Sequence, residues 1–157
     1  MLADTGDRRQ FESGAVRDMG HGKGRCDLLP LDSISTLDKI SELDKIIMSR
    51  LNSFKETGDP FWLRKAINSF ILEVFKDLYT AMLELAKHYE DGAIKYGVDN
   101  WRKGIPANIY IDSAIRHYFK FRRGDEDEPH ARAFLWNIIC CIWTCDNIPE
   151  LNVYIKS

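Results

Sequence analysis

The architecture of this chain follows from one apolar segment near its C-terminal end, HARAFLWNIICCIWTC, residues 130–145. Placed at 100° per residue, its apolar side chains spread around most of a helix, which is typical of a central, buried helix. One narrow polar seam remains, with His130, Asn137 and Thr144 at seven-residue spacing and Cys141 beside them. Burying an unpartnered imidazole or amide costs about 1–3 kcal/mol. We therefore expect the seam to face either polar groups of neighbouring helices or a ligand cavity.

Helical periodicity and capping residues extend through most of the chain upstream of this segment. Gly58 can end a first helix, and Asp59-Pro60 then opens a long second one. The four predicted helices span about residues 35–58, 59–96, 108–123 and 128–145. These patterns predict an all-α fold, a single-domain helical bundle of about four main helices over residues 32–157. Residues 1–31 form an N-terminal arm, and residues 151–155 a short strand or a docking tail.

Composition excludes several classes of protein. The 157 residues carry a net charge of −2, which argues against bulk nucleic-acid binding. A hydrophobic share of 45% argues against disorder, and no apolar run approaches the roughly 20 residues of a membrane span. The four cysteines lack the spacing of a disulfide framework or a zinc site, which predicts free thiols and a cytoplasmic location.

Two cationic segments are candidates for binding phosphate. In the stretch GHGKGR, residues 20–25, Lys23 and Arg25 alternate with glycines, so the segment is either a loop that brings cations to a ligand or a mobile arm. On the predicted third helix, Arg116 can bind phosphate through its planar guanidinium or simply pair with Asp112 four residues earlier. His117 lies at the boundary between the cationic and the apolar face of this helix. There it is either a structural residue or a side chain that reaches into a cleft.

The predicted second helix carries an acidic stripe. Its members lie within about 60° of one another on the helical wheel: Glu73, Asp77, Glu84, His88 and Asp91. Carboxylates stacked in this way can hold Mg²⁺, which would also orient a triphosphate, or they can form a solvated face. Because the stripe points away from the apolar side of the helix, a metal site there needs a partner subunit or the N-terminal arm to cover it. We therefore expect a homo-oligomer.

The link after this helix brings polar and aromatic side chains together in a short turn, namely Lys95, Tyr96, Asn100 and Trp101. An aromatic ring beside an amide suits stacking on a nucleotide base with hydrogen bonds to its edge. The same pair suits a helix-capping turn with a core-filling tryptophan equally well, so both interpretations stay open.

Taken in order, several motifs resemble a phage-borne family, the dATP/dGTP diphosphohydrolase N-terminal domain. The opening motifs are FESGAVRD (11–18), GKGR (22–25) and DLLP (27–30). The later motifs are LAKHYEDGAIKYG (85–97), Asn100-Trp101, Ala114-Ile115-Arg116-His117, Gly124-Asp125, His130 and Trp136-Asn137. The resemblance covers about residues 11–31 and 80–145, which makes residues 32–79 an insertion relative to the family.

The resemblance implies a helical protein that splits a purine deoxynucleoside triphosphate into the monophosphate and pyrophosphate with a divalent metal. It also suggests a phage or prophage source. Two positions depart from the family pattern, because Ala133 stands where many members carry a second histidine and Asp125 where they carry a glutamate. If that second histidine binds metal, the departure at Ala133 bears on catalysis.

The resulting hypothesis is a Mg²⁺-dependent hydrolase with three groups of residues. The catalytic candidates are His117, His130 and Asp125. The candidates for nucleotide binding are Lys23, Arg25, Lys95, Tyr96, Asn100, Trp101, Arg116 and Asn137. The candidates for metal binding are Glu84, His88, Asp91 and Asp127. One alternative is a non-catalytic protein that sequesters a cyclic or modified nucleotide signal in phage counter-defence, and another is a structural helical adaptor.

Overall fold

The computed structural model describes residues 7–156, and these residues are mostly helical. The all-α class is therefore confirmed. The α-helices are α1 (Leu31–Ile34), α2 (Glu42–Thr57), α3 (Phe61–Phe70), α4 (Leu78–Tyr96), α5 (Ala107–Arg123) and α6 (His130–Asn147). The shorter elements are an antiparallel hairpin of β1 (Arg8–Gln10) and β2 (Val16–Asp18), the 3₁₀ turns η1 (Cys26–Leu28), η3 (Asn100–Lys103) and η4 (Pro149–Leu151), and the π-helical turn η2 (Ile71–Phe75).

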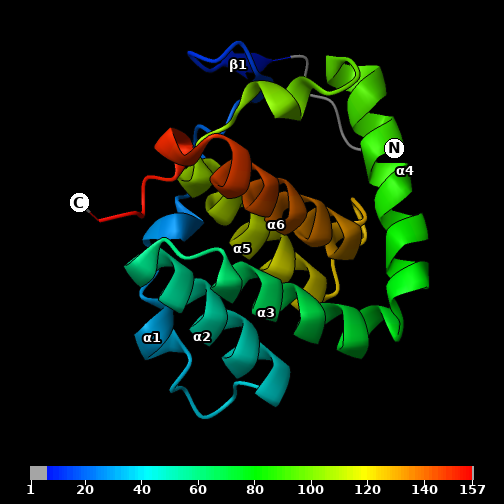
Figure 1. Cartoon of the computed structure of the whole chain (residues 1–157). Coiled ribbons are helices and arrows are strands. Elements are labelled where there is room, and N and C mark those ends of the chain that lie inside the picture. Colours follow the sequence, from blue (N-terminus) through cyan, green and yellow to red (C-terminus); the bar gives the residue numbers. More distant parts are fainter. Residues whose placement is uncertain (1–6, 157) are drawn as a thin grey trace.

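Helix α6 runs through the middle of the molecule, with α5 against it and α3 below (Figure 1). Phe134 of α6 is fully buried, with its ring centroid 4.5 Å from that of Phe70 on α3 and 5.5 Å from that of Tyr118 on α5. The three rings form the junction of these helices. The central position predicted for residues 130–145 is confirmed, and the seam residues His130, Asn137 and Thr144 are all buried.

The prediction of one continuous helix over residues 59–96 is wrong. Helix α3 ends at Phe70, the π-helical turn follows, and Lys76 adopts a left-handed φ of 75°. Asp77 then caps α4, its Oδ1 accepting a hydrogen bond from the Thr80 N–H at 2.7 Å. The break lets α3 stay on α2 while α4 rises along the edge of the molecule (Figure 1). It also removes Glu73 and Asp77 from the face of α4 that carries the rest of the acidic stripe.

The other helix boundaries agree with the sequence within a few residues, except at the start of the first helix. Helix α2 begins after Ser41, where Ser41 and Asp44 form a reciprocal capping box. Because this capping box is a stronger cap than Ser35 alone, α2 begins at Glu42, seven residues after Ser35. Residues 151–155 form no strand and instead dock, with Asn152 Nδ2 donating to the Gly58 carbonyl at 2.7 Å.

The N-terminal segment packs on the helices from Asp7 to Leu31, and residues 1–6 of the predicted arm lie outside the described part. The Cys26 N–H donates to Asp112 Oδ1 of α5 at 2.6 Å, and Ala15 is fully buried. Figure 1 shows the hairpin above η3. The segment is therefore a wall of the molecule, although the predicted domain boundary at residue 31 stays a prediction.

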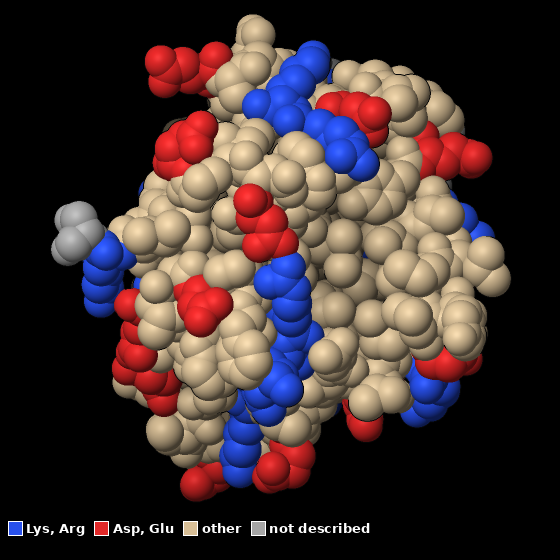
Figure 2. All heavy atoms as spheres, in the orientation of Figure 1, with Lys and Arg blue, Asp and Glu red and all other residues tan. Residues whose placement is uncertain are grey.

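The outer face of α4 has exposed apolar side chains, which include Leu78, Tyr79, Leu83 and Ile94. On the face of the molecule that Figure 2 shows, both signs of charge are interspersed among uncharged side chains. Within residues 7–156, none of the helices combines the length and the apolar character that crossing a bilayer requires.

Gly58 and Gly92 offer a test of the packing between the C-terminal tail and α2. Gly58 has a left-handed φ of 71°, and a Cβ built there would lie 2.7 Å from the Ile155 backbone nitrogen. We expect Gly58→Ala to lower the free energy of unfolding by more than about 1 kcal/mol, because left-handed backbone and a clash with rigid main chain add together. The measurement is chemical denaturation followed by circular dichroism.

Gly92→Ala is the matched control, since Gly92 lies within α4 and a Cβ there would touch nothing within 4 Å. This variant should gain about 0.5–1 kcal/mol, from the lower conformational entropy of the unfolded chain. Equal stability of the two variants would contradict the packing of the tail against Gly58.

Candidate functional site

A cavity of about 440 Å³ lies between the N-terminal hairpin, the glycine loop, η3 and helices α4, α5 and α6. Its size falls within the usual range for small-molecule sites. All of the predicted nucleotide-binding residues except Arg25 line it, and so do His88 and His117. The structure therefore gathers side chains that are up to 114 positions apart in the sequence, from Lys23 to Asn137, around one space.

Arg17 of β2 forms part of the cavity wall. Its Nη1 donates to Asn137 Oδ1 of α6 and its Nη2 to Ser113 Oγ of α5, both at 3.2 Å. The guanidinium also lies over the rings of Tyr110 and Trp136, with its carbon 5.6 and 5.5 Å from their centroids. These contacts fix the cation in place without neutralising it.

Cations outnumber the carboxylates available to them in this cavity. Among residues 7–156, four cationic lining residues make no ion pair: Arg9, Arg17, Lys23 and Lys120. Burial, and then the nearby Arg17, lowers the pKa of Arg9, whose buried Nε has no hydrogen-bond partner in the described residues. Burial also lowers the pKa of Lys23, with Arg116 and Arg17 adding to the effect. A bound polyanion would relieve this repulsion.

Arg116 and Lys95, both predicted to bind nucleotide, line the cavity as members of ion pairs. Arg116 Nη2 donates to both Asp112 carboxylate oxygens at 2.8 Å and to the Gly24 carbonyl at 2.6 Å. Lys95 pairs with Asp18 at 3.0 Å. Arg116 thus holds the glycine loop against α5, while its buried Nε has no hydrogen-bond partner among the described residues.

Arg25 lies outside the cavity lining. Its guanidinium makes two hydrogen bonds of 2.8 Å with the carboxylate of the buried Asp27. In this glycine loop the alternation of residues therefore places Lys23 at the cavity and Arg25 in an ion pair elsewhere.

Asn100 and Trp101 contact protein rather than presenting their polar atoms to the cavity. Asn100 Oδ1 accepts from the Val16 N–H and its Nδ2 donates to the Val16 carbonyl, both at 2.9 Å. The amide therefore acts as a clamp that holds β2. The Trp101 ring packs edge-on against Trp143 and Tyr89, with centroids 5.0 and 5.6 Å apart. The geometry supports a turn with a packed tryptophan, which also lines the cavity.

The acidic stripe of α4 is covered by a cation from α6. Arg132 Nη2 lies 3.0 Å from Asp91 Oδ2, and its Nη1 lies 3.9 Å from Glu84 Oε2. Lys87 also pairs with Glu84 at 2.7 Å. Because Arg132 supplies the balancing positive charge within one chain, the residues fit a salt-bridge network better than a Mg²⁺ site. A second subunit is not needed to cover them, and the predicted homo-oligomer stays a prediction.

His88 is buried between α4 and α6. Its ring packs against Trp136, with centroids 5.5 Å apart, and its Nδ1 has no hydrogen-bond partner among residues 7–156. Burial, followed by the positive charges of Arg132, Arg17 and Lys95, lowers the pKa of His88 to about 3. The ring is therefore neutral at physiological pH.

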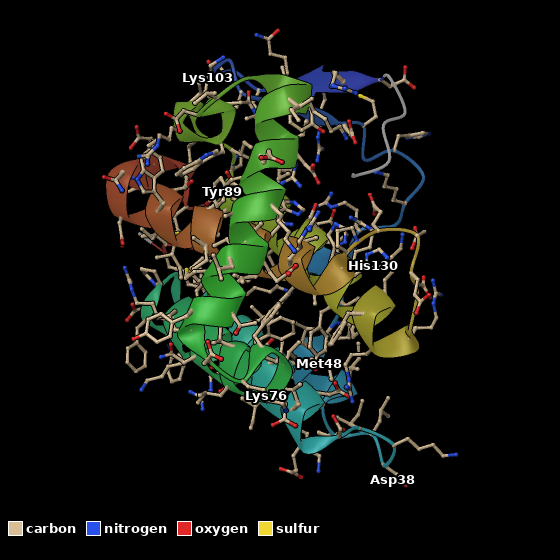
Figure 3. The ribbon with its side chains drawn as sticks, turned by 90° about the vertical axis from the view of Figure 1, so that its right-hand side faces the viewer. Asp38, Met48, Lys76, Tyr89, Lys103 and His130 are labelled. Carbon is tan, nitrogen blue, oxygen red and sulfur yellow. The ribbon has the colours of Figure 1, made fainter. Side chains whose placement is uncertain are left out.

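A chain of three side chains joins the cavity to the loop between α5 and α6. His117 Nδ1 lies 2.9 Å from His130 Nδ1, and His130 Nε2 lies 2.7 Å from Asp127 Oδ1. His130 starts α6 beside that loop (Figure 3). Burial, and then His130, lowers the pKa of His117 to about 3, so this ring is also neutral at pH 7. Asp125, the third catalytic candidate, pairs with Arg123 and does not line the cavity.

Two groups of side chains in the described part of the chain have the spacing of a metal site, and they share His130. One consists of His117, Glu128 and His130, and the other of Asp125, Asp127 and His130. Glu128 and Arg17 were missed by the sequence analysis as site residues. In the sequence, Glu128 marks only the start of a helix, and no local pattern shows that Arg17 reaches Asn137.

The fold and the cavity define a class, a small all-α protein with a cavity lined by cationic and aromatic side chains. In comparison with known families, residues 71–153 match the family described as dATP/dGTP diphosphohydrolase, N-terminal. The match covers more than half of the 157 residues, so the chain belongs to this family. No curated protein and no solved structure matches it.

The family match begins at Ile71, where α3 ends, and includes α4, α5 and α6. The resemblance expected over residues 80–145 is thereby confirmed. Residues 11–31 lie outside the match, although they supply Arg17 and Lys23 to the cavity. The family segment therefore forms one part of the cavity wall, and the N-terminal segment completes it.

The neutral state of His88 predicts a pH dependence of stability. Because its pKa is about 3 in the folded chain and near 6.5 when unfolded, only the unfolded chain gains this proton as the pH falls below 6.5. Stability should decrease from pH 6 to pH 4, with His88 contributing up to about 1.4 kcal/mol per pH unit. Denaturation curves of the metal-free protein and of His88→Gln measure this, and the variant should have the shallower slope. Parallel slopes, or an NMR midpoint of His88 near 6.5, would contradict the burial.

Proposed function

We propose that the chain binds a purine deoxynucleoside triphosphate in this cavity and hydrolyses it to the monophosphate and pyrophosphate with a divalent metal. The observation that carries the proposal is the group of four cations without carboxylate partners, Arg9, Arg17, Lys23 and Lys120, around one cavity. A polyphosphate supplies the negative charge that these side chains lack. The family name supports the reaction and the purine substrate.

Two kinds of side chain line the cavity, and each suits a different part of a nucleotide. The hairpin, the glycine loop and α5 bring the cations, which suit the phosphates. Tyr89, Trp101 and Trp136 line the cavity as well, and aromatic faces and edges suit a base. Asn100 then acts indirectly, because its clamp on Val16 places the neighbouring Arg17.

In the proposed reaction a water oxygen adds to the α-phosphorus and the bond to the α–β bridging oxygen breaks. Pyrophosphate leaves with the electrons of that bond, and the proton of the water passes to the products or to solvent. The cations of the cavity hold the phosphates and offset the charge of the leaving group. When bound, a divalent metal neutralises phosphate charge and makes its water more acidic.

His117 and His130 would supply the reactive end of the site. His117 lines the cavity beside Lys120, and His130 orients it from behind at 2.9 Å. The two rings hold each other in place, because His117 of α5 and His130 of α6 are joined through their Nδ1 atoms. Among the described residues, no other pair of histidines on neighbouring helices is in contact. A neutral imidazole can accept a proton or bind a metal ion.

Replacing Arg17 tests whether the cavity binds phosphate. We expect Arg17→Met to weaken binding of dATP or dGTP by about 10- to 100-fold, because one charge-assisted contact contributes about 1.5–3 kcal/mol. Isothermal titration calorimetry measures affinity, and release of pyrophosphate in the presence of Mg²⁺ or Mn²⁺ measures turnover.

Arg64→Met is the control, since Arg64 lies on α3 and pairs with Asp146 away from the cavity. It should leave affinity and turnover within about twofold. Tight binding without pyrophosphate release would favour the alternative of a protein that sequesters a nucleotide. If neither nucleotide binds, the proposal fails.

A further inference from the structure

We propose that His117, His130 and Glu128 form a binding site for one divalent transition-metal ion at the cavity wall. The ligand atoms would be Nδ1 of each histidine and a carboxylate oxygen of Glu128. One ligand atom from each of the three residues lies within 4.8 Å of the other two, and the two Nδ1 atoms are 2.9 Å apart. The inference deepens the proposed function by naming the metal class and its ligands, but metal binding itself requires no nucleotide.

The two imidazoles have the geometry of neighbouring ligands. Their Nδ1 atoms lie 2.9 Å apart, and the rings are tilted by 36° with centroids 5.2 Å apart. Nitrogens that each lie about 2.1 Å from one ion are about 3 Å apart when the angle at the ion is near 90°. The pair can therefore bind one ion with little movement of either ring.

Asp127 fixes the tautomer of His130 that metal binding needs. His130 Nε2 lies 2.7 Å from Asp127 Oδ1, so the proton sits on Nε2 and donates to the carboxylate. The lone pair of His130 Nδ1 then accepts the proton of His117 Nδ1, and that proton moves to Nε2 of His117 when both Nδ1 atoms bind an ion. A carboxylate behind a histidine ligand is the usual arrangement in metal sites, where it orients the ring and strengthens its binding. His130 is only 2% exposed, which holds this orientation.

Glu128 completes the group from the loop that precedes α6. Its carboxylate makes no hydrogen bond or ion pair within the described part of the chain, and the residue lines the cavity together with His117 and Lys120. Ligands from α5, the loop and α6 thus meet at one edge of the cavity. An ion there would lie at the same cavity as the cations proposed to bind phosphate.

The donor set points to a transition metal rather than to Mg²⁺. Imidazole nitrogen suits Zn²⁺, Fe²⁺ and Ni²⁺, and Co²⁺ lies between the last two in affinity, whereas Mg²⁺ prefers oxygen ligands and retains water. The rival group of Asp125, Asp127 and His130 would use His130 Nε2 and would open on the other side of the loop. There, Asp125 is already paired with Arg123, and Asp127 would have to release His130.

Titration of the metal-free, nucleotide-free protein with Co²⁺ tests the site, because nitrogen ligation gives a visible ligand-field band. The wild type should bind one Co²⁺ per chain. Glu128→Gln and His117→Gln should each weaken binding at least tenfold and change the band. Asp125→Asn, which removes a ligand of the rival group only, and His21→Gln, an exposed histidine of the glycine loop, should bind within about twofold of wild type. Circular dichroism without metal checks that each variant is folded.

Three results would overturn the inference. The first is no Co²⁺ band in the wild type, and the second is a loss in Asp125→Asn with none in Glu128→Gln, which would place the ion on the rival group. The third is unchanged binding in every variant. Nucleotide hydrolysis by a wild type that binds no Co²⁺ would refute this site but leave the proposed function standing. Co²⁺ binding at this site without nucleotide binding would support the metal site and refute the proposed function.

Discussion

The guanidinium of Arg17 joins the N-terminal hairpin to the central helices, and the cavity depends on that contact. It donates to Ser113 on α5 and Asn137 on α6 while lying over Tyr110 and Trp136. Each partner is neutral, so the contact fixes the hairpin and leaves the positive charge uncompensated. The same contact therefore closes the fold and makes the cavity attractive to an anion.

Several charged side chains elsewhere in the molecule are paired, unlike the guanidinium of Arg17. The α4 carboxylates Glu84 and Asp91 face Arg132, and Asp112 faces Arg116. Such local pairing distributes the charges of a chain whose net charge is −2. The described carboxylate at the cavity wall that remains without an ion pair is Glu128, next to His117 and His130. Cations and this histidine–carboxylate group thus meet around one cavity, as a metal-dependent phosphate site requires.

Helices and helix ends that are set by neighbouring residues could be predicted from the sequence. The buried α6, the ends of α5 and the stop at Gly58 follow from periodicity, glycine and proline. The break at Lys76 was missed because the apolar spacing continues through it, and the Asp77 cap was read as part of an acidic stripe. Most candidate site residues reach one cavity, but their contacts join Arg17 to Asn137 and Asn100 to Val16 across the chain. Such pairings are set by tertiary packing, which spacing along a sequence does not contain.

The central claim is that the phosphates of a nucleotide lie between the N-terminal cations and the histidines of α5 and α6. A crystal structure of the full chain with Mn²⁺ and a non-hydrolysable dATP analogue tests it most directly. The account predicts triphosphate density against Arg9, Arg17 and Lys23, with an anomalous manganese peak between His117, His130 and Glu128. Triphosphate bound outside the cavity, or a manganese peak at Glu84 and Asp91 in place of Arg132, would contradict it.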